Sequence, residues 1–272
     1  MNKVDPAQSV IIGSTRLYAI IGDPIAQVGS PRVFNPIMAR SGVDAVLVPM
    51  RVAAKDLATA WAGLKAIGNF DGVIFTIPHK IPMTKLVDTV LTTGKLVGAV
   101  NAARREKDGR WTADMFDGRG CVRGLRDTLG FDPDGKSALV VGAGGAGSAV
   151  ACALAEAGAR RMTIADTVGA RAGRLARVVT GTYTATAAQT GAADPKGHDL
   201  IVNCTPLGMK PDDLLPLDAG ALKKSMTVVD IVLLPEPSKL LAAATAKGCQ
   251  VMNGLAMLKG QAMEVSRFFG FA

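Results

Sequence analysis

The sequence predicts an α/β protein with two domains, each built on a sheet that contains parallel strands. Strand-like and helix-like segments alternate along the whole chain, which is the pattern of parallel sheets covered by helices. The chain has 272 residues, of which 49% are hydrophobic and only 4% aromatic. It is therefore long enough for two domains of about 100–150 residues each, with cores built mainly from aliphatic side chains.

In the first part of the chain, strands are predicted at 16–22, 45–50 and 71–78, helices at 30–42, 54–68 and 83–91, and a β-hairpin at 98–115. The hairpin is expected to turn at Asp108-Gly109, a dipeptide that suits a tight turn. Ser30 stands directly before Pro31 at the start of the first helix. We expect Ser30 to be the N-cap and Pro31 the first helical residue.

In the second part, helices are predicted at 120–130 and 146–158, strands at 137–142, 161–166, 198–205 and 226–233, and a last amphipathic helix at 254–269. The stretch Ser137–Ala155 carries no charge over about the length of a membrane-spanning helix. Its clustered glycines favour a strand, a turn and a helix instead. The domains are predicted at 1–116 and 117–253, with 254–272 completing the first.

The net charge of +8 and the pI near 9.5 suit a field that attracts anions such as carboxylates and phosphates. The arginines at 169–179 could equally be solvated on a helix face. No zinc-finger or aromatic–basic motif accompanies the charge, so we expect no nucleic-acid partner. We also expect no association with membranes.

The four cysteines, Cys121, Cys152, Cys204 and Cys249, lie far apart and form no Cys-x-x-Cys pair. This spacing argues against disulfides and zinc, and it favours a reducing compartment. The first residues do not show a basic-then-apolar signal pattern, so we predict a cytoplasmic protein. His, Cys, Asp and Glu do not cluster as metal ligands do, and there is no Gly-x-Ser-x-Gly pattern for nucleophilic catalysis.

A glycine-rich loop joins the strand at 137–142 to the helix that follows it. Gly142, Gly144 and Gly147 form the Gly-x-Gly-x-x-Gly pattern of dinucleotide-binding folds. In that pattern the first glycine permits a tight turn, the second lets the backbone approach the pyrophosphate, and the third allows close packing of helix and strand. The residues predicted to hold the cofactor here are Gly142, Gly144, Gly145, Ala146 and Gly147. We therefore expect a Rossmann domain with a doubly wound parallel sheet.

Asp166 ends the next strand, about 20 residues after the glycines, where an acid binds the ribose 2′-hydroxyl of the adenosine. A carboxylate there accepts hydrogen bonds from a free ribose diol but repels a 2′-phosphate. This predicts a preference for NAD over NADP. Arg171 is near enough in sequence to pair with such a phosphate, so NADP stays open. Asp166 could also cap the helix that begins near Val168, and both roles are compatible.

Seven motifs occur in order along the chain: "GDPIAQVGSP", "FTIPHK", "GAVNA", "DMFDG", "GAGGAG", "NCTPLGM" and "NGLAMLKGQA". With them the chain resembles the shikimate dehydrogenase family over essentially its full length. The resemblance implies an N-terminal substrate-binding domain, a Rossmann domain and a cleft between them. It also implies the reversible, NAD(P)-dependent oxidation of a ring hydroxyl on a small cyclic carboxylic acid such as shikimate.

Carried over by position, the resemblance implies that Lys80 and Asp117 are the catalytic pair, and it leaves open which of them accepts the proton. It places Ser30, Thr76, Asn101 and Gln261 at substrate-contacting positions, and Thr205, Ile231 and Gly254 near the cofactor. Each of these four substrate positions also has a structural alternative. Ser30 could be a helix cap and Thr76 a strand residue. Asn101 could be a partner for backbone groups, and Gln261 a solvated residue on a helix.

Val28, Ile74, Phe116 and Leu233 depart from the family pattern, replacing a serine, an asparagine, a threonine and a tyrosine. They predict a less polar substrate end and leave the ring open, with quinate or a modified shikimate as alternatives. The competing functions are a catalytically weak sensor that binds a dinucleotide and a small acid, and a folate-type dehydrogenase. His79 aligns with a family phenylalanine, so we expect it to be packed or exposed rather than catalytic. Monomer and homodimer are both open.

Overall fold

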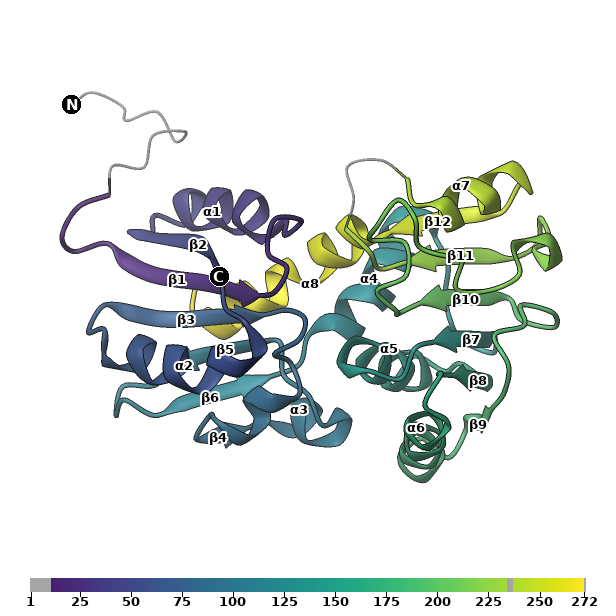
Figure 1. The fold of residues 1–272 in the computed structure, drawn as a ribbon, viewed down its shortest axis with the longest axis horizontal. Coiled ribbons are helices and arrows are strands. Elements are labelled where there is room, and N and C mark those ends of the chain that lie inside the picture. The colour runs from purple at the N-terminus through teal and green to yellow at the C-terminus, as the bar shows by residue number, and fades with distance from the viewer. Residues whose placement is uncertain (1–10, 234–236, 272) are drawn as a thin grey trace. The chain divides into compact units, whose positions relative to one another are not determined.

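The structure, a computed structural model, describes residues 11–233 and 237–271. The chain divides into two compact units: unit 1 is Met1–Phe116 with Ala262–Ala272, and unit 2 is Asp117–Gln261 (Figure 1). Residues 1–10, 234–236 and 272, which the predicted domain ranges include, lie outside the described residues. The division falls inside the last helix, which therefore contributes to both units.

The sheet of unit 1 has six strands in the order β2-β1-β3-β5-β6-β4, as Figure 1 shows from top to bottom. The strands are β1 (Arg16–Gly22), β2 (Ala45–Arg51), β3 (Phe70–Phe75), β4 (Thr89–Val90), β5 (Ala102–Arg105) and β6 (Trp111–Asp114). The helices are α1 (Ser30–Arg40), α2 (Leu57–Ala66) and α3 (Thr92–Val97), with 3₁₀ turns at Ala54–Asp56 and Pro82–Lys85. Because β1, β2 and β3 are parallel, their carboxyl ends meet at one edge of the sheet.

Two local predictions are wrong. α1 begins at Ser30 with Gly29 as its N-cap, so Ser30 is the first helical residue and does not cap the helix. The helix predicted at 83–91 is absent, because the 3₁₀ turn at Pro82–Lys85 leads into the short strand β4, which pairs with β6. The β-branched Thr89 and Val90 suit a strand, and the partner strand available in the fold outweighs the helical pattern of the segment.

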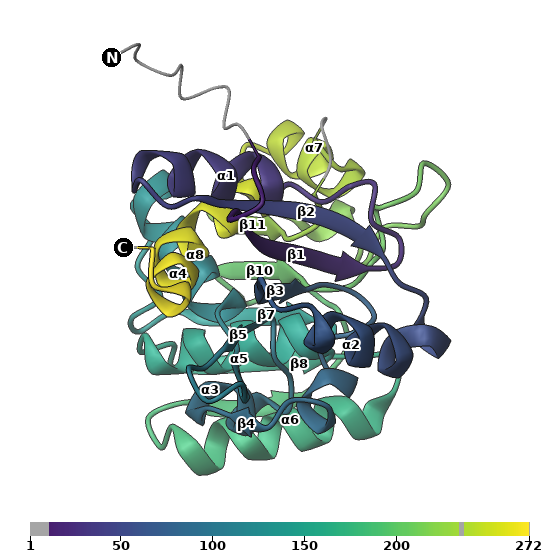
Figure 2. The same cartoon turned by 90° about the vertical axis from the view of Figure 1, so that its left-hand side faces the viewer.

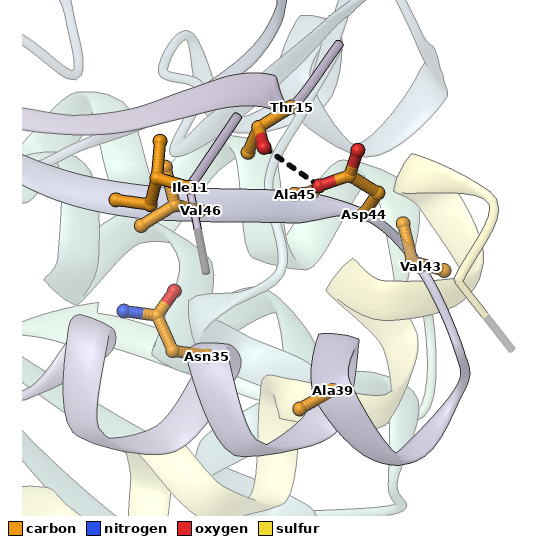
Figure 3. A pocket seen from close by; sticks show the side chains of 8 residues that line it. All are labelled: Ile11, Thr15, Asn35, Ala39, Val43, Asp44, Ala45 and Val46. Atoms are coloured by element: carbon orange, nitrogen blue, oxygen red, sulfur yellow. Dashed lines mark hydrogen bonds between the residues drawn. The ribbon is translucent and has the colours of Figure 1, made fainter. Parts of the chain in front are cut away.

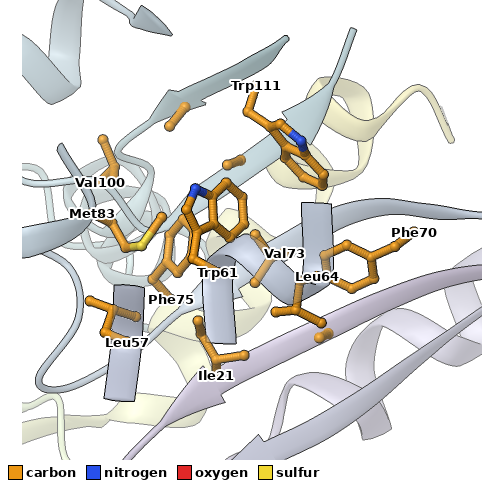
Figure 4. Packing of buried hydrophobic residues seen from close by; sticks show 13 residues of the cluster. Ile21, Leu57, Trp61, Leu64, Phe70, Val73, Phe75, Met83, Val100 and Trp111 are labelled. Carbon is orange, nitrogen blue, oxygen red and sulfur yellow. The ribbon is translucent and has the colours of Figure 1, made fainter. Parts of the chain in front are cut away.

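One face of the unit 1 sheet is covered by α2 and has an aromatic core (Figure 4). Trp61 of α2 lies edge-on to Trp111 and Phe75, with ring centroids 4.8 and 6.0 Å apart. The indole N–H of Trp61 donates to the carbonyl of Leu86 at 2.9 Å. This buried donor is therefore satisfied, and the α2 face of the sheet is closed.

The opposite face of this sheet carries α1 and the end of α8 (Gly254–Phe269), and Figure 2 shows α1 and α2 on either side of β1. Tyr18 of β1 packs against Phe269 and Phe271, with ring centroids 5.1 and 4.9 Å apart. The last residues of the chain therefore close the core of the first unit.

The sheet of unit 2 is entirely parallel, in the order β12-β11-β10-β7-β8-β9. Its strands are β7 (Ser137–Val141), β8 (Arg161–Ala165), β9 (Ala187–Thr190), β10 (Leu200–Asn203), β11 (Thr227–Asp230) and β12 (Gln250–Asn253). Its helices are α4 (Asp117–Leu129), α5 (Gly145–Glu156), α6 (Gly169–Thr182), α7 (Lys239–Ala246) and the first part of α8, with a 3₁₀ turn at Ala219–Ala221. The strand order reverses between β7 and β10, which is the Rossmann topology. The predicted α/β class is confirmed.

The uncharged stretch Ser137–Ala155 forms β7, a glycine turn and α5. Within the described ranges, none of the helices is long and apolar enough to cross a membrane. All aromatic residues of the chain except Phe131 and Tyr183 belong to unit 1. Most of the buried residues in both cores are Ala, Val, Leu, Ile and Met, so the expectation of mainly aliphatic cores holds, and the few aromatic residues concentrate in unit 1.

Candidate functional site

Thr76, Lys80 and Asn101 are brought together at the carboxyl edge of the unit 1 sheet. Thr76 follows β3 directly, and Lys80 lies in the turn after it. The N–H of Phe75 donates to the carbonyl of Asn101 at 2.8 Å, and the N–H of Val100 donates to the carbonyl of Lys80 at 2.9 Å. The turn that carries Lys80 is thus bound along the segment that carries Asn101, at the edge where α/β sheets bind ligands.

Glycine and asparagine side chains fix this edge. A Cβ at Gly22, the last residue of β1, would overlap the methyl group of Thr76 and come within 3.0 Å of the carbonyl oxygen of Ile77. Asn101 is 2% exposed, and its Oδ1 accepts a hydrogen bond from the N–H of Phe116 at 2.9 Å. Asn101 therefore orients the backbone that leads directly into Asp117. The structural alternative expected for Asn101, a side chain that bonds backbone groups, is confirmed.

The residues that depart from the family pattern lie in several environments. Phe116 is buried and packs against Phe268, with ring centroids 5.1 Å apart, so its side chain belongs to the core of unit 1. Ile74 is also buried and shares a strand face with Thr76. Val28 and Leu233 are half-buried. Ser30 is buried at the start of α1.

Asp117 and Gln261 lie on two helices of unit 2 that touch at backbone distance. Asp117 is the first residue of α4 and is 1% exposed, and Gln261 on α8 is 7% exposed, so Gln261 is not a solvated helix residue. A Cβ at Gly120 of α4 would lie 2.7 Å from the Cβ of Gln261, and one at Gly260 would overlap the carbonyl oxygen of Gly120. A Cβ at Gly118 would likewise overlap the carbonyl of Ala149 on α5. Glycines thus let α4 lie directly against both neighbouring helices.

The glycines of the loop between β7 and α5 meet three different demands. Gly142 has a φ of 100°, a conformation that other residues rarely adopt. A Cβ at Gly147 would overlap the carbonyl oxygen of Gly142, whereas one at Gly144 would meet no atom within 4 Å. The backbone at Gly144 is therefore open on the side where a Cβ would stand, directly before the N-terminus of α5 at Gly145 and Ala146. This arrangement fits the pyrophosphate of a dinucleotide.

Asp166 lies at the carboxyl end of β8, beside this loop. Its Oδ2 accepts a hydrogen bond from the N–H of Ala143 at 2.7 Å, and its Oδ1 accepts one from the N–H of Val168 at 2.7 Å. The carboxylate therefore holds the glycine loop and the start of α6 at the same time. Each oxygen has a second lone pair with which a ribose hydroxyl can bond.

Thr205, Ile231 and Gly254 are connected by a buried polar network that sequence reasoning missed. Asn203 is the last residue of β10, and its Oδ1 accepts a hydrogen bond from the hydroxyl group of Thr205 at 2.7 Å. Its backbone carbonyl accepts one from the N–H of Ile231 at 3.2 Å. Its Nδ2 donates to Oδ1 of Asp230 at 3.0 Å. A Cβ at Gly254 would overlap the carbonyl of Ile231. The loops after β10 and β11 are therefore tied together.

Asp230 is the centre of this network and is 1% exposed. Its Oδ2 accepts a hydrogen bond from the hydroxyl group of Ser238 at 2.6 Å, and its Oδ1 accepts one from the N–H of Val232 at 3.2 Å. Burial raises the pKa of the Asp230 carboxyl, and the hydrogen bonds from Ser238, Val232 and Asn203 oppose that rise. One feature of the sequence could have pointed to Asp230: it is an acidic residue at the end of a buried, apolar strand.

A small cavity of about 40 Å³ lies at the opposite end of β2, where Thr15 donates to Oδ1 of Asp44 at 2.7 Å (Figure 3). It has room for about one water molecule, too little for a ring or a nucleotide. In the described part of the chain, no three His, Cys, Asp or Glu side chains gather in a way that could hold a metal ion.

A family profile described as the shikimate dehydrogenase substrate binding domain matches residues 20–103. Over 259 residues the chain is 39% identical to a protein named shikimate dehydrogenase (NADP(+)) from Geobacter sp. strain M21, covering 92% of this chain and 88% of that one. It is similar to the crystal structure of a shikimate dehydrogenase in complex with NADP+, with 30% identity, a TM-score of 0.87 and coverage of 96% and 92%. It is also similar to the quinate dehydrogenase from Corynebacterium glutamicum in complex with NAD, with 29% identity, a TM-score of 0.81 and coverage of 95% and 94%.

Proposed function

We propose, since this chain belongs to the shikimate dehydrogenase family, that it interconverts shikimate and 3-dehydroshikimate. A closely related pair of cyclic acids is the alternative. The chain is an NAD(P)-dependent dehydrogenase that acts on a CH–OH group. The observation that carries the proposal is the identity of 39% with a relative named shikimate dehydrogenase, over 92% of this chain. The grouping of Thr76, Lys80 and Asn101 at one sheet edge supports it.

We assign the proton transfer to Lys80 and Asp117. In the oxidation direction the substrate hydroxyl loses its proton while the carbon that bears it loses a hydride. When bound, the dinucleotide supplies the hydride acceptor. Either the neutral amine of Lys80 or the carboxylate of Asp117 accepts the proton, and the other group orients the hydroxyl. The ammonium form of Lys80 also stabilises the oxygen as negative charge develops on it.

We assign the contacts with the substrate's hydroxyl and carboxyl groups to Ser30, Thr76, Asn101 and Gln261. Hydroxyl and amide side chains both donate and accept hydrogen bonds, so they can read a ring that carries both kinds of group. The buried Asn101 and Gln261 are held in place by the packing around them, which favours a fixed substrate orientation over a loose one.

We propose that NAD is preferred over NADP. The carboxylate of Asp166 stands at the end of β8 and is anchored on the loop through the N–H of Ala143. A 2′-phosphate placed against it would repel its charge, whereas a free ribose diol can donate to it. The relative from Geobacter is named for NADP(+), so the preference proposed here distinguishes this chain from it.

An absorbance assay at the nicotinamide band tests the proposal, crossing NAD and NADP with shikimate and quinate. We expect turnover with shikimate and a higher kcat/KM with NAD than with NADP. A higher kcat/KM with NADP would refute the cofactor preference and leave the enzyme proposal intact. Tight dinucleotide binding without turnover of either acid would instead favour a sensor.

Quinate is the second candidate substrate, since the similar structure from Corynebacterium glutamicum is a quinate dehydrogenase in complex with NAD. The same assay separates the two acids by their kcat/KM values.

We further propose a reducing, cytoplasmic site of action. Cys121, Cys152 and Cys249 are buried thiols, and burial raises the pKa of Cys121 to about 12 and that of Cys152 to about 11, so these two are poorly reactive.

A further inference from the structure

His79 stands between Pro78 and Lys80, and its imidazole is held by one directed bond. The side chain is 0% exposed, and Nε2 lies 2.7 Å from the carbonyl oxygen of Val52. A carbonyl can only accept, so Nε2 carries the proton and donates it. Nδ1 is buried and has no hydrogen-bond partner within the part of the chain that the structure describes. His79 is therefore packed, as expected, but it is also a donor with a specific target.

This bond joins the loops after β3 and β2, and two backbone bonds connect both loops to the end of β1. Val52 follows β2, and its N–H donates to the carbonyl of Gly22 at the end of β1 at 3.1 Å. The N–H of Asp23 donates to the carbonyl of Ile77 after β3 at 2.9 Å. The ends of β2, β1 and β3 are thus linked in a closed circuit, to which His79 contributes a side chain and the other residues contribute backbone groups.

The same turn determines the position of Lys80. The N–H of His79 donates to the carbonyl of Thr76 at 2.8 Å, and the carbonyl of His79 accepts the N–H of Met83 at 3.0 Å. The carbonyl of Lys80 accepts the N–H of Val100. Because His79 and Lys80 are consecutive in this hydrogen-bonded turn, a shift of the His79 backbone also moves the Cα atom of Lys80.

We propose that His79 is a positioning residue for Lys80, which acts by donating from Nε2 to the carbonyl of Val52. The proposal rests on the proposed role of Lys80 in proton transfer. Val52 is half-buried, and without the imidazole donor its carbonyl loses this hydrogen bond. The turn then loses its side-chain link to the loop after β2 and can shift. A shift of about 1 Å in a reacting group can lower the rate by about 100-fold.

Two substitutions separate the hydrogen bond from the volume of the side chain. In His79→Gln the amide nitrogen can donate from about the position of Nε2, whereas in His79→Phe the ring fills the space without a donor. We expect kcat to fall about 10-fold or more in His79→Phe and to stay within about 3-fold of the wild type in His79→Gln. The dissociation constant of NAD should not change in either variant, because the glycine loop belongs to unit 2.

His198 offers a matched control, since its Nε2 bonds to the hydroxyl oxygen of Thr163 at 2.9 Å and its Nδ1 is also buried without a partner among the described residues. His198→Phe should leave kcat unchanged, whatever it does to the melting temperature. Equal kcat for His79→Phe and the wild type would overturn the proposal. So would a His79→Gln variant that melts like the wild type and is as slow as His79→Phe.

A second readout keeps this test independent of the proposed function. Turnover of shikimate or quinate by the wild type tests the function itself. If the wild type turned over neither acid, that proposal would fail, and hydrogen exchange would still test His79. We expect the amides of Met83 and Val100 to exchange faster in His79→Phe and at the wild-type rate in His79→Gln, and unchanged exchange in both would overturn the positioning role.

Discussion

At the scale of single residues, chemical type and local geometry agree most closely in the loop between β7 and α5. Gly142 needs a positive φ, Gly147 needs the absence of a Cβ against the carbonyl of Gly142, and Gly144 leaves open space. Gly142 and Gly147 are positions where only glycine fits without strain, so the pattern could be recognised in the sequence. The Lys80 turn differs, because its geometry depends on partners from three strands.

Substitution of Lys80 tests its proposed part in the reaction. Lys80→Ala should lower kcat by about 10²-fold or more, as expected when general acid–base assistance is lost. Steady-state kinetics with the preferred acid measure this, and NAD binding by fluorescence should be unchanged. Lys85→Ala is the control, since Lys85 is an exposed lysine in the next turn. A Lys80→Ala variant with near-normal kcat would remove Lys80 from the mechanism.

Asp166 is expected to set the choice of cofactor through its charge. Asp166→Asn keeps an oxygen that can accept the N–H of Ala143 but removes the negative charge. The ratio of kcat/KM with NADP to that with NAD should rise about 10-fold or more, because like charges facing each other cost several kcal/mol. Asp194→Asn, at an exposed turn, is the control. An unchanged ratio would show that cofactor choice lies elsewhere.

At the level of helices and strands, the close approach of α4 to its neighbouring helices, rather than helical propensity, explains the glycines of α4. α4 carries Gly118 against α5 and Gly120 against α8, so the helix that begins with Asp117 touches two neighbours at backbone distance. The intrinsic preference of glycine is unfavourable in a helix. Its presence here is explained by the packing alone, which the pattern of α4 by itself does not reveal.

Gly120→Ala and Gly173→Ala should therefore change stability in opposite directions. A Cβ at Gly173 of α6 meets its nearest atom, Nη1 of Arg177, at 3.8 Å, so alanine should stabilise the protein by about 0.5–1 kcal/mol. At Gly120 the new methyl group lies 2.7 Å from the Cβ of Gln261, and overpacking should destabilise by about 1–3 kcal/mol. Urea denaturation of both variants measures the difference, and equal shifts would contradict the close approach of α4 and α8.

At the scale of the whole molecule, the two units solve the same packing problem with different residues. Unit 1 gathers nearly all the aromatic side chains around Trp61, Trp111 and Tyr18, whereas the core of unit 2 is aliphatic. A fully parallel sheet with helices on its faces favours aliphatic and β-branched residues. Average composition therefore predicted the mainly aliphatic residues of both cores, but it did not predict that the few aromatic residues gather in unit 1.

The buried Asp230 links the stability of the protein to pH. Since its pKa is raised above the unfolded value of 3.8, its protonated form is favoured by folding. That contribution is fully present below the unfolded pKa and is lost as the pH rises through the folded pKa. Asp230→Asn removes it, so the stability of the variant relative to the wild type should increase as the pH is raised from about 4 to 7.

Chemical denaturation of the wild type and of Asp230→Asn at a series of pH values measures this difference. The exposed or half-buried carboxylates whose pKa is lowered, such as Asp199 and Asp213, are common to both proteins, so their opposite pH dependence cancels. A difference that does not vary with pH would show that the carboxyl of Asp230 titrates alike in the folded and unfolded chain.

Prediction from sequence succeeded where the information is local. The strands at 16–22 and 137–142 and the glycine loop were placed closely, because short continuous apolar runs bounded by turn residues specify them directly. The helix expected at 83–91 failed because a partner strand at β6 decided the conformation of Thr89 and Val90. Asp230 was missed because its importance comes from Asn203 and Ser238, which reach it only in the fold.

Residue types at fixed spacings encode the alternation of strands and helices, the glycine loop and the resemblance to the family, so these features could be read from the chain alone. Three contacts could not: Asn101 orients the backbone before Asp117, Gly120 lets α4 touch α8, and His79 donates to Val52. A hydrogen bond or a close contact depends on distance in space, which sequence separation does not give. His79 and Val52 are 27 residues apart in the chain, and the sheet brings them within 2.7 Å.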